Sequence, residues 1–144
     1  MNLAYFLTPK QDVTTLFDDN TYRKGLEILR KSGQSTLPVT TREGVYVGVV
    51  TAGDFLWRIV NGDVDKKGNL VVTPSEGVMV KDIMKDKNYP PVNITASLDD
   101  LLSVISNQNF VPVVDARGVL IGIVRRHTVL DHLAQEMKKN RQGT

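Results

Sequence analysis

The stretch Gly122-Ile123-Val124-Arg125-Arg126-His127-Thr128-Val129-Leu130 decides the fold, because an earlier stretch of the chain repeats its pattern. That earlier stretch is Gly48-Val49-Val50-Thr51-Ala52-Gly53-Asp54-Phe55-Leu56. Each begins with a glycine and continues with a short apolar run typical of a strand, a polar cluster and the start of a helical apolar pattern. Both copies therefore predict a polar strand-to-helix junction that could face a ligand, and the chain is an internal repeat.

The offset between the two copies is 122 − 48 = 74 residues, and it aligns more of the chain. Leu37-Pro38-Val39 falls on Val111-Pro112-Val113, and Gly44 falls on Gly118. The alternation of short strand patterns with helical patterns indicates an α/β (α+β) protein made of two βαββα-like repeats.

The repeats are assigned to residues 1–62 and 78–144, and the polar, glycine-containing stretch 63–77 is assigned to the linker. A half of this size is marginal as an isolated domain, because a small domain buries little apolar surface. The two repeats are therefore expected to pack against each other.

The composition excludes several classes of protein. With 41% hydrophobic and 24% charged residues, the chain of 144 residues has the composition of an ordinary globular protein. A net charge of +2 is too small to indicate a nucleic-acid partner. No apolar run reaches the length of a membrane span and no secretory leader is recognised, so a cytoplasmic location without a membrane partner is expected. The absence of cysteine excludes disulfides and thiolate chemistry.

The apolar periodicity and the capping residues predict the same order of elements in both repeats. The first is expected to have a lead helix (1–7), a strand (13–17), a helix (21–31) closed by Gly33, a hairpin (36–40 and 45–50) and a second helix (52–60). The second is expected to have a lead helix (80–84), a strand (91–94), a helix opened by the Ser97 capping box, a hairpin (110–114 and 119–124), a final helix and a frayed basic tail (138–141).

Four apolar stripes are expected to face the core. They are Tyr22, Leu26 and Leu29; Phe55, Leu56, Ile59 and Val60; Leu98, Leu101, Leu102 and Ile105; and Val129, Leu130, Leu133, Ala134 and Met137. Pro38 cannot donate to a sheet ladder and is expected at the start or the edge of a strand.

At the first junction, Thr51 and Asp54 lie one helical turn apart, so their side chains share a face. A hydroxyl beside free N–H groups at a helix N-terminus suits a phosphate oxygen. An ionised carboxylate suits a vicinal diol, because it accepts two hydrogen bonds. However, Thr-x-x-Asp is also close to a capping box, which needs no ligand, and the spacing alone favours the cap.

At the second junction, Arg125, Arg126 and His127 place cations at the start of a helix. Exposed cations there cost roughly 0.3–1 kcal/mol, because they meet the positive end of the helix dipole. A bound anion would offset this cost, and two guanidinium groups fit a diphosphate or a cyclic dinucleotide. The alternative is that Arg126 points to solvent and Arg125 pairs with an acid such as Asp131.

Three motifs carry a resemblance to a known family. Asp19-Asn20-Thr21-Tyr22 is similar to the Asp-x-Thr-Leu helix start of CBS domains, and Gly33 to Val39 is similar to their Gly-x-x-x-x-Pro-Val strand. Residues 48–54 are similar to their Gly-h-h-Thr-x-x-Asp signature, in which h is apolar. With two copies in register, nearly the whole chain resembles a tandem CBS-domain pair (a Bateman module) of the stand-alone bacterial type.

The resemblance implies a pseudo-twofold disc with two clefts between the repeats, and a homodimer. Cleft one would combine Val13, Thr14, Ser35, Thr36 and Leu37 with Arg125, Arg126, His127 and Thr128. Cleft two would combine Pro91, Asn109, Phe110 and Val111 with Thr51 and Asp54. Backbone groups at Val13 and Thr36 would read the adenine edge, and Phe110 would either stack on a base or belong to the core.

The second repeat has Arg125 and Thr128 where the first has Thr51 and Asp54, which departs from the family's ribose-binding pattern. The Arg125-Arg126 pair and residues 35–38 look similar to the site of bacterial CBS pairs that bind cyclic di-AMP. The resemblance therefore implies an adenine nucleotide as regulatory ligand, with cyclic di-AMP first and AMP, ADP or ATP next.

A catalytic role is not expected, because no serine or threonine has the sequence context of a nucleophile with its base. No metal and no cofactor are expected either, since His127 and His132 lack the i, i+4 spacing of a helical metal pair. The expected function is a regulatory module that signals to a protein partner of unknown identity. The alternative is a ligand-free CBS scaffold that mediates dimerisation and protein–protein interaction.

Overall fold

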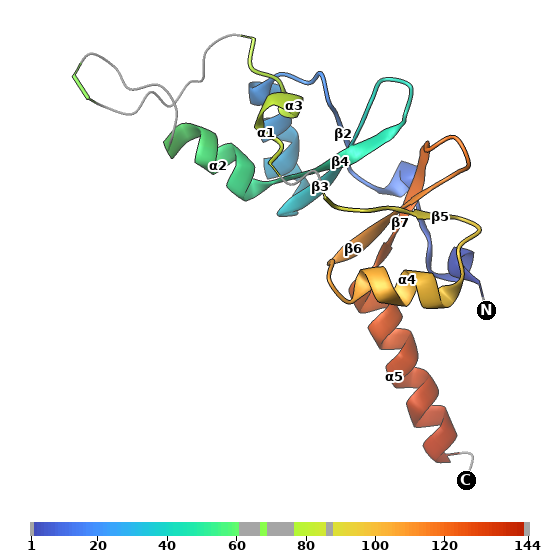
Figure 1. The fold of residues 1–144 in the computed structure, drawn as a ribbon. Coiled ribbons are helices and arrows are strands. Elements are labelled where there is room, and N and C mark those ends of the chain that lie inside the picture. The colour runs from blue at the N-terminus through green and yellow to red at the C-terminus, as the bar shows by residue number, and fades with distance from the viewer. Residues whose placement is uncertain (1, 61–66, 69–76, 86–87, 143–144) are drawn as a thin grey trace. The chain divides into compact units, whose positions relative to one another are not determined.

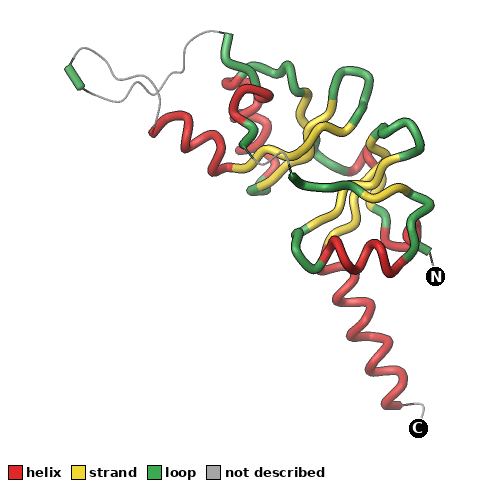
Figure 2. Tube along the Cα trace, viewed as in Figure 1, coloured by secondary structure: helices red, strands yellow, loops and turns green. Residues whose placement is uncertain are grey.

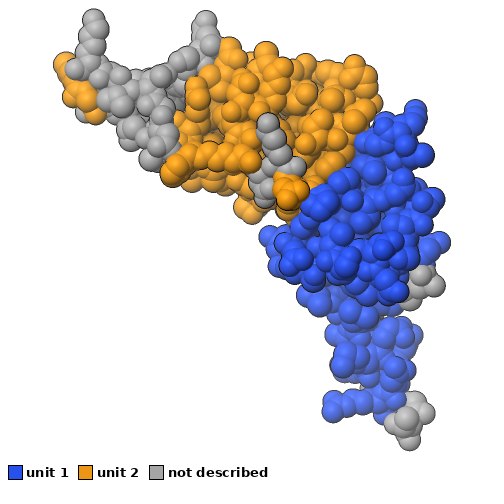
Figure 3. All heavy atoms as spheres, viewed as in Figure 1, with its two compact units in different colours: residues 1–13, 90–144 blue, residues 14–89 orange. Residues whose placement is uncertain are grey.

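The computed structural model describes residues 2–60, 67–68, 77–85 and 88–142, which form short helices and two small sheets (Figure 1 and Figure 2). The chain divides into two compact units, coloured separately in Figure 3. Unit 1 consists of residues 1–13 and 90–144, and unit 2 of residues 14–89. Most of the predicted linker lies outside the described residues.

Unit 2 contains one βαββα succession followed by a short helix. Its elements are β2 (Leu16–Phe17), α1 (Tyr22–Ser32), β3 (Thr36–Thr40), β4 (Tyr46–Thr51), α2 (Ala52–Val60) and α3 (Val80–Ile83). The sheet order is β2-β3-β4, with β2 parallel and β4 antiparallel to β3.

Unit 1 contains the second βαββα succession and the N-terminal segment. Its elements are η1 (Leu3–Phe6) and η2 (Lys10–Asp12), both 3₁₀-helices, with β1 (Thr8–Pro9), β5 (Val92–Asn93), α4 (Leu98–Ile105), β6 (Phe110–Val114), β7 (Leu120–Arg125) and α5 (Arg126–Gln142). The sheet order is β1-β7-β6-β5. The predicted α/β class with two βαββα repeats is confirmed, and both hairpins keep the offset of 74 residues.

The segment before each repeat completes the core of the other repeat. Leu3 and Phe6 of η1 lie in the apolar core of unit 1, and β1 pairs with β7. Val80 and Ile83 of α3 lie in the apolar core of unit 2. The compact units therefore differ from the linear division at residues 62 and 78, while the packing of the two repeats stays a prediction.

Helix α1 has the predicted capping residues. The N–H of Lys24 donates to Oγ1 of Thr21 at 3.1 Å, and Gly33 has φ 68°, in the left-handed region that favours glycine. The predicted burial of Leu26 is wrong, because this side chain is 38% exposed. The buried face passes through Gly25 instead, where an added Cβ would lie 2.7 Å from Cγ2 of Val80.

The expected stripes on α2 and α5 are only partly buried. Phe55 and Val129 are in the cores, whereas the predictions for Leu56, Leu130, Leu133, Ala134 and Met137 are wrong, since all five are exposed. The side chains of Ile59 and Val60 lie outside the described residues. The predicted frayed tail is wrong as well, because residues 138–141 continue α5, and the two lysines and the arginine among them are good helix formers.

The stripe on α4 is confirmed, with Leu101 and Ile105 buried and Leu98 and Leu102 half-buried against them. Pro38 lies in the central strand of its sheet, but β2 pairs only with the two residues that follow it. At Pro38 the strand therefore has a neighbour on one side only, which makes it a local edge and explains why proline is tolerated.

Candidate functional site

At the first junction, β4 runs directly into α2, and the N–H of Ala52 donates to the carbonyl oxygen of Ser35 at 2.8 Å. Thr51 and Asp54 cap the helix reciprocally. The N–H of Thr51 donates to Oδ2 of Asp54 at 2.9 Å, and the N–H of Asp54 donates to Oγ1 of Thr51 at 3.1 Å. The capping box is thus formed without a ligand, and within the described residues Oδ1 of Asp54 accepts no hydrogen bond.

At the second junction, β7 runs into α5 with the same backbone geometry, since the N–H of Arg126 donates to the carbonyl oxygen of Asn109 at 2.9 Å. The side chains differ. Arg125 occupies the position of Thr51 but has no acceptor, and Thr128 replaces the carboxylate of Asp54. In the described part of the chain, no side chain accepts a hydrogen bond from the N–H of His127 or Thr128.

Arg126 is held by a side chain at this junction. Its Nη2 donates to Oδ1 of Asn109 at 2.6 Å. It is therefore not simply directed to solvent, and the alternative ion pair between Arg125 and Asp131 is not present among the described residues. Two guanidinium groups and open N–H donors at one helix start form an arrangement that suits an anion.

The predicted site residues divide between the two units. Unit 2 holds Thr14, Ser35, Thr36, Leu37, Thr51 and Asp54, and unit 1 holds Val13, Pro91, Asn109, Phe110, Val111, Arg125, Arg126, His127 and Thr128. Each predicted cleft draws on both units, so the two clefts stay predictions. Asn109 and Arg126, which the resemblance assigns to different clefts, are hydrogen-bonded to each other.

Three of these residues offer a ligand little side-chain surface. Leu37 is 2% exposed, Phe110 6% and Val111 0%. The structure therefore places Phe110 in the core, the second of the two roles considered for it. A buried polar neighbour, Gln108, was not foreseen: its Nε2 donates to the carbonyl oxygens of Pro90 at 3.3 Å and Phe110 at 3.2 Å.

A cavity of about 230 Å³ lies beside Asp54 in unit 2. It is lined by Asp54, Trp57, Arg58, Asp82, Ile83 and Lys85. Nζ of Lys85 lies 3.8 Å from the centroid of the Trp57 ring. Sequence reasoning missed this cavity because α3 precedes the second repeat, although the i, i+4 spacing of Asp54 and Arg58 on α2 was a signal that could have been used.

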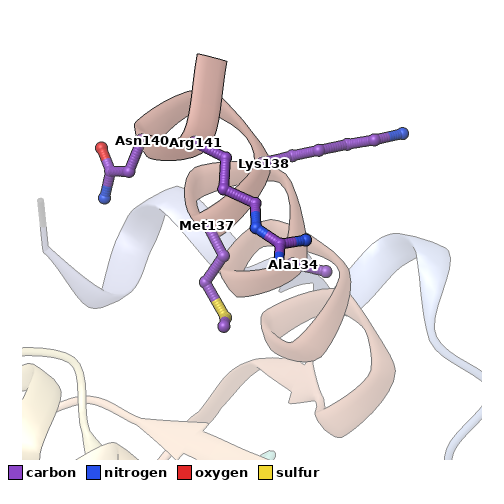
Figure 4. A pocket seen from close by; sticks show the side chains of 5 residues that line it. All are labelled: Ala134, Met137, Lys138, Asn140 and Arg141. Carbon is purple, nitrogen blue, oxygen red and sulfur yellow. The ribbon is translucent and has the colours of Figure 1, made fainter. Parts of the chain in front are cut away.

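A second hollow, of about 680 Å³, lies along the C-terminal end of α5 (Figure 4). It is lined by Ala134, Met137, Lys138, Asn140 and Arg141. All five side chains come from one helix, so this is an open surface hollow rather than a cleft between elements. It has no carboxylate or backbone donor directed at one point and is a poor candidate for a small-ligand site.

Within the described residues, no group of three or more histidine, aspartate or glutamate side chains is arranged to hold a metal ion. His132 packs instead against Tyr5 and Phe6, with ring centroids 5.2 and 5.4 Å away, and its Nε2 lies 4.0 Å from Oε1 of Glu136. None of the described helices combines the length and the apolar character that crossing a bilayer requires.

The chain is similar to several known proteins. An uncharacterised protein of Methanocaldococcus jannaschii is 25% identical over an alignment of 117 residues, which covers 77% of this chain and 43% of that relative's length. A crystal structure of CbpB in complex with c-di-AMP (cyclic di-AMP) matches with a TM-score of 0.84 at 22% identity, covering 100% of this chain and 91% of the other. CbpB of Listeria monocytogenes, also in complex with c-di-AMP, matches with a TM-score of 0.78 at 23% identity, covering 94% and 97%.

The family model of the CBS domain matches residues 6–61 and again residues 80–135. The two matches together cover most of the chain, and each contains one strand-to-helix junction. The chain belongs to the CBS domain family and carries a tandem pair of these domains.

Proposed function

We propose that this protein is a non-catalytic regulatory module that binds an adenine nucleotide and signals to a partner protein. The observation that carries the proposal is the second junction, where Arg125 and Arg126 lie at a helix start that no described side chain caps and Asn109 holds Arg126. An anionic ligand would supply acceptors for both guanidinium groups and for the free N–H groups.

Cyclic di-AMP is the first candidate ligand, and AMP, ADP and ATP follow. Its two phosphates match the two guanidinium groups, and the similarity to CbpB structures that contain c-di-AMP supports this order. In this proposal, Arg125 and Arg126 bind phosphate, with His127 and Thr128 beside them. Backbone groups at Val13 and Thr36 read the adenine edge, as the family resemblance implies.

The first junction would take a different part of a nucleotide. Oδ1 of Asp54 is left over from the cap and can accept a hydrogen bond from a ribose hydroxyl. Thr51 keeps its capping role, so ligand binding there would not require the helix start to open. The remaining members of cleft two, Pro91 and residues 109–111, stay part of the proposal through the family resemblance.

A thermal-shift panel with cyclic di-AMP, AMP, ADP, ATP, cyclic di-GMP and S-adenosylmethionine tests the proposal. A ligand at a hundred times its dissociation constant stabilises a protein by about 2.7 kcal/mol, which raises Tm by several degrees for a chain of this length. Arg126→Ala is expected to abolish the shift with cyclic di-AMP and to leave the unliganded Tm nearly unchanged.

Arg117→Ala is the matched control, because Arg117 is an exposed arginine of the same unit that pairs with Asp115 in the hairpin loop. An equal cyclic di-AMP shift in wild type and Arg126→Ala would contradict the assignment of Arg126. If AMP or ATP raised Tm and cyclic di-AMP did not, the protein would instead be a sensor of adenylate charge that uses Thr51 and Asp54.

A ligand-free scaffold is the second candidate, and two observations favour it. The Thr51–Asp54 cap is complete without a ligand. Leu56 and Trp57 on α2 are exposed, as are Leu130, Leu133 and Met137 on α5, and such apolar surface suits a homodimer. Light scattering after size-exclusion chromatography would then give the mass of a dimer, Leu133→Asp would reduce it to the monomer mass, and no nucleotide would shift Tm.

A further inference from the structure

The last turns of helix α5 project beyond the core of unit 1. Val129, near the start of the helix, is 3% exposed, and His132 and Glu136 are half-buried, whereas every residue from 137 to 141 is exposed. Figure 1 shows this end of the helix extending away from the sheet and from α4 of the same unit. Short helical segments are marginally stable without tertiary packing, so a partner that covered these turns would stabilise them.

These turns are strongly basic. Lys138, Lys139 and Arg141 lie within four successive positions, with no acidic residue among them. Lys138 and Lys139 form no ion pair among the described residues. Glu136, the acid that precedes them, lies beside His132 instead, with 4.0 Å between Oε1 and Nε2. Cations in the last turn of a helix also offset its dipole, so this charge alone does not indicate a partner.

The surface hollow of about 680 Å³ along the same turns is a second, independent feature (Figure 4). Ala134 and Met137 supply its apolar lining, and Lys138 and Arg141 line it as cations. Met137 is 70% exposed, although methionine is among the residues most often buried. An exposed apolar side chain with cations around it matches the apolar centre and polar rim of a protein-binding surface, where a flexible methionine adapts to its partner.

The shape and the charge of the hollow indicate what can occupy it. Ala134, Met137 and Arg141 follow one another at spacings of three and four residues, so the hollow runs along one face of α5. A second helix packs along such a row of side chains, and the small Ala134 lets it approach closely. The cations that line the hollow require acidic side chains beside the apolar contact. The occupant that fits is an amphipathic helix with aspartate or glutamate beside its apolar stripe.

Other occupants fit this hollow less well. A second copy docked through the same hollow would present the same patch on both subunits, which brings the cations of one copy against those of the other. A helix that lies on a membrane presents a broad apolar face to the lipid, whereas the lining here has two apolar residues, Ala134 and Met137. The net charge of +2 does not favour a nucleic acid.

We propose that the last two turns of α5 dock an acidic amphipathic helix of a partner protein. An apolar side chain of that helix packs on Ala134 and Met137, and its carboxylates pair with Lys138 and Arg141. This assignment deepens the proposed function, on which it rests for the existence of a partner protein, by stating the chemistry of that partner.

Fluorescence anisotropy with the full chain and a labelled synthetic peptide tests this docking surface. The peptide has about three heptads with leucine at positions a and d and glutamate at e and g, and its glutamates keep it from pairing with itself. A second peptide carries lysine in place of every glutamate. The glutamate peptide is expected to bind at least about tenfold more tightly than the lysine peptide, because it alone complements Lys138 and Arg141.

Variants of α5 locate the binding. Lys138→Gln with Arg141→Gln should weaken binding of the glutamate peptide about three- to tenfold, because two exposed ion pairs are lost. Met137→Gln should weaken it about tenfold, since glutamine keeps the helix propensity of methionine but removes the apolar contact. Arg23→Gln with Lys24→Gln is the matched control, because it removes the same charge from exposed positions of α1. Circular dichroism checks that each variant keeps its helix content.

Four outcomes overturn the docking surface. The first two are equal binding of both peptides and unchanged affinity in the Lys138→Gln, Arg141→Gln variant. The third is that the glutamate peptide does not bind, whether or not the protein binds phosphatidylserine vesicles instead. The fourth is a wild-type dimer in light scattering that Met137→Gln turns into a monomer, because the occupant is then a second copy.

The thermal-shift panel separates this docking surface from the proposed function. If no nucleotide raises Tm and the glutamate peptide still binds at α5, the docking surface stands and nucleotide binding does not. If cyclic di-AMP raises Tm equally in the wild type and in Met137→Gln but neither protein binds the peptide, the docking surface alone is overturned.

Discussion

The two strand-to-helix junctions share a backbone and differ in how their helix starts are satisfied. In both, the first N–H of the helix donates to the carbonyl oxygen of the residue just before the neighbouring strand. The distances are 2.8 Å from Ala52 and 2.9 Å from Arg126. The first junction then completes its own cap with Thr51 and Asp54. Among the described residues, no side chain caps the second, which has arginines instead, so the same backbone carries two helix starts of different chemistry.

The largest expected effect on stability is at Gly122, which lies in β7, the strand that leads to the second junction. An alanine Cβ at Gly122 would lie 2.3 Å from the carbonyl oxygen of Thr8, because β1 pairs with β7 there. Gly122→Ala should lower the free energy of unfolding by about 2–3 kcal/mol, since the buried backbone must move to make room. The equivalent glycine of the first repeat, Gly48, lies in β4, which is an edge strand of the sheet of unit 2, whereas β7 lies between β1 and β6. Urea unfolding measures the loss.

Gly53→Ala is the control for Gly122→Ala. A Cβ at Gly53 would lie 3.5 Å from Oγ1 of Thr51, an ordinary contact, and the position is an exposed one in α2. This change should stabilise by up to about 1 kcal/mol, because alanine is the better helix former. If Gly122→Ala were as stable as the wild type, the pairing of β1 with the second repeat would be contradicted.

The second prediction compares the caps directly. Asp54→Ala should lower the free energy of unfolding by about 1–2 kcal/mol, because the part-buried N–H of Thr51 loses its acceptor. Thr128→Ala at the equivalent position should cost less than about 0.5 kcal/mol, since no cap depends on it. Thermal and urea unfolding of both variants test the difference, and equal losses would mean that the second junction is capped as well.

Sequence patterns correctly predicted the structural features that depend on residues close together in the chain. The offset of 74 residues gave both hairpins, and Thr21, Gly33 and Ser97 marked helix ends that the structure confirms. Those features depend on local backbone geometry and on capping hydrogen bonds, which a short stretch of sequence specifies.

Features that depend on tertiary packing were missed. Apolar period alone cannot tell whether a stripe is covered, and Leu26, Leu56 and Leu130 are exposed. The crossing of η1 and α3 into opposite cores joins residues far apart in sequence, as does the contact of Asn109 with Arg126. The cavity of Arg58 and Lys85 escaped prediction for the same reason.

A smaller effect is expected inside the hairpins. The buried Oγ1 of Thr40 has no hydrogen-bond partner among the described residues, whereas the equivalent residue of the second repeat is Val114. Thr40→Val should raise the free energy of unfolding by about 1 kcal/mol, because an unsatisfied hydroxyl is removed at nearly constant volume. Val114→Thr should lower it by about 1–2 kcal/mol. A loss of stability in Thr40→Val would mean that this hydroxyl has a partner in solution.

The smallest effect on stability, and the most informative one for function, is expected at Asn109. Asn109→Ser should change the free energy of unfolding by less than about 0.5 kcal/mol, since the bond to Arg126 is exposed. Affinity for cyclic di-AMP should fall about three- to tenfold in calorimetry, because an unheld arginine must be ordered on binding. Asn107→Ser is the control, because Asn107 is an exposed asparagine of the same unit and is not among the predicted site residues.

A double-mutant cycle then separates two roles for Asn109. If it acts only by positioning Arg126, Asn109→Ser should have no further effect on nucleotide affinity once Arg126→Ala is present. If it contacts the ligand itself, as its assignment to cleft two implies, the two losses should add. Additive losses would mean that Asn109 contacts the ligand itself, so that the second junction contributes to both clefts. Full coupling would mean that Asn109 acts only through Arg126, so that this one side chain distinguishes the second junction as an anion site.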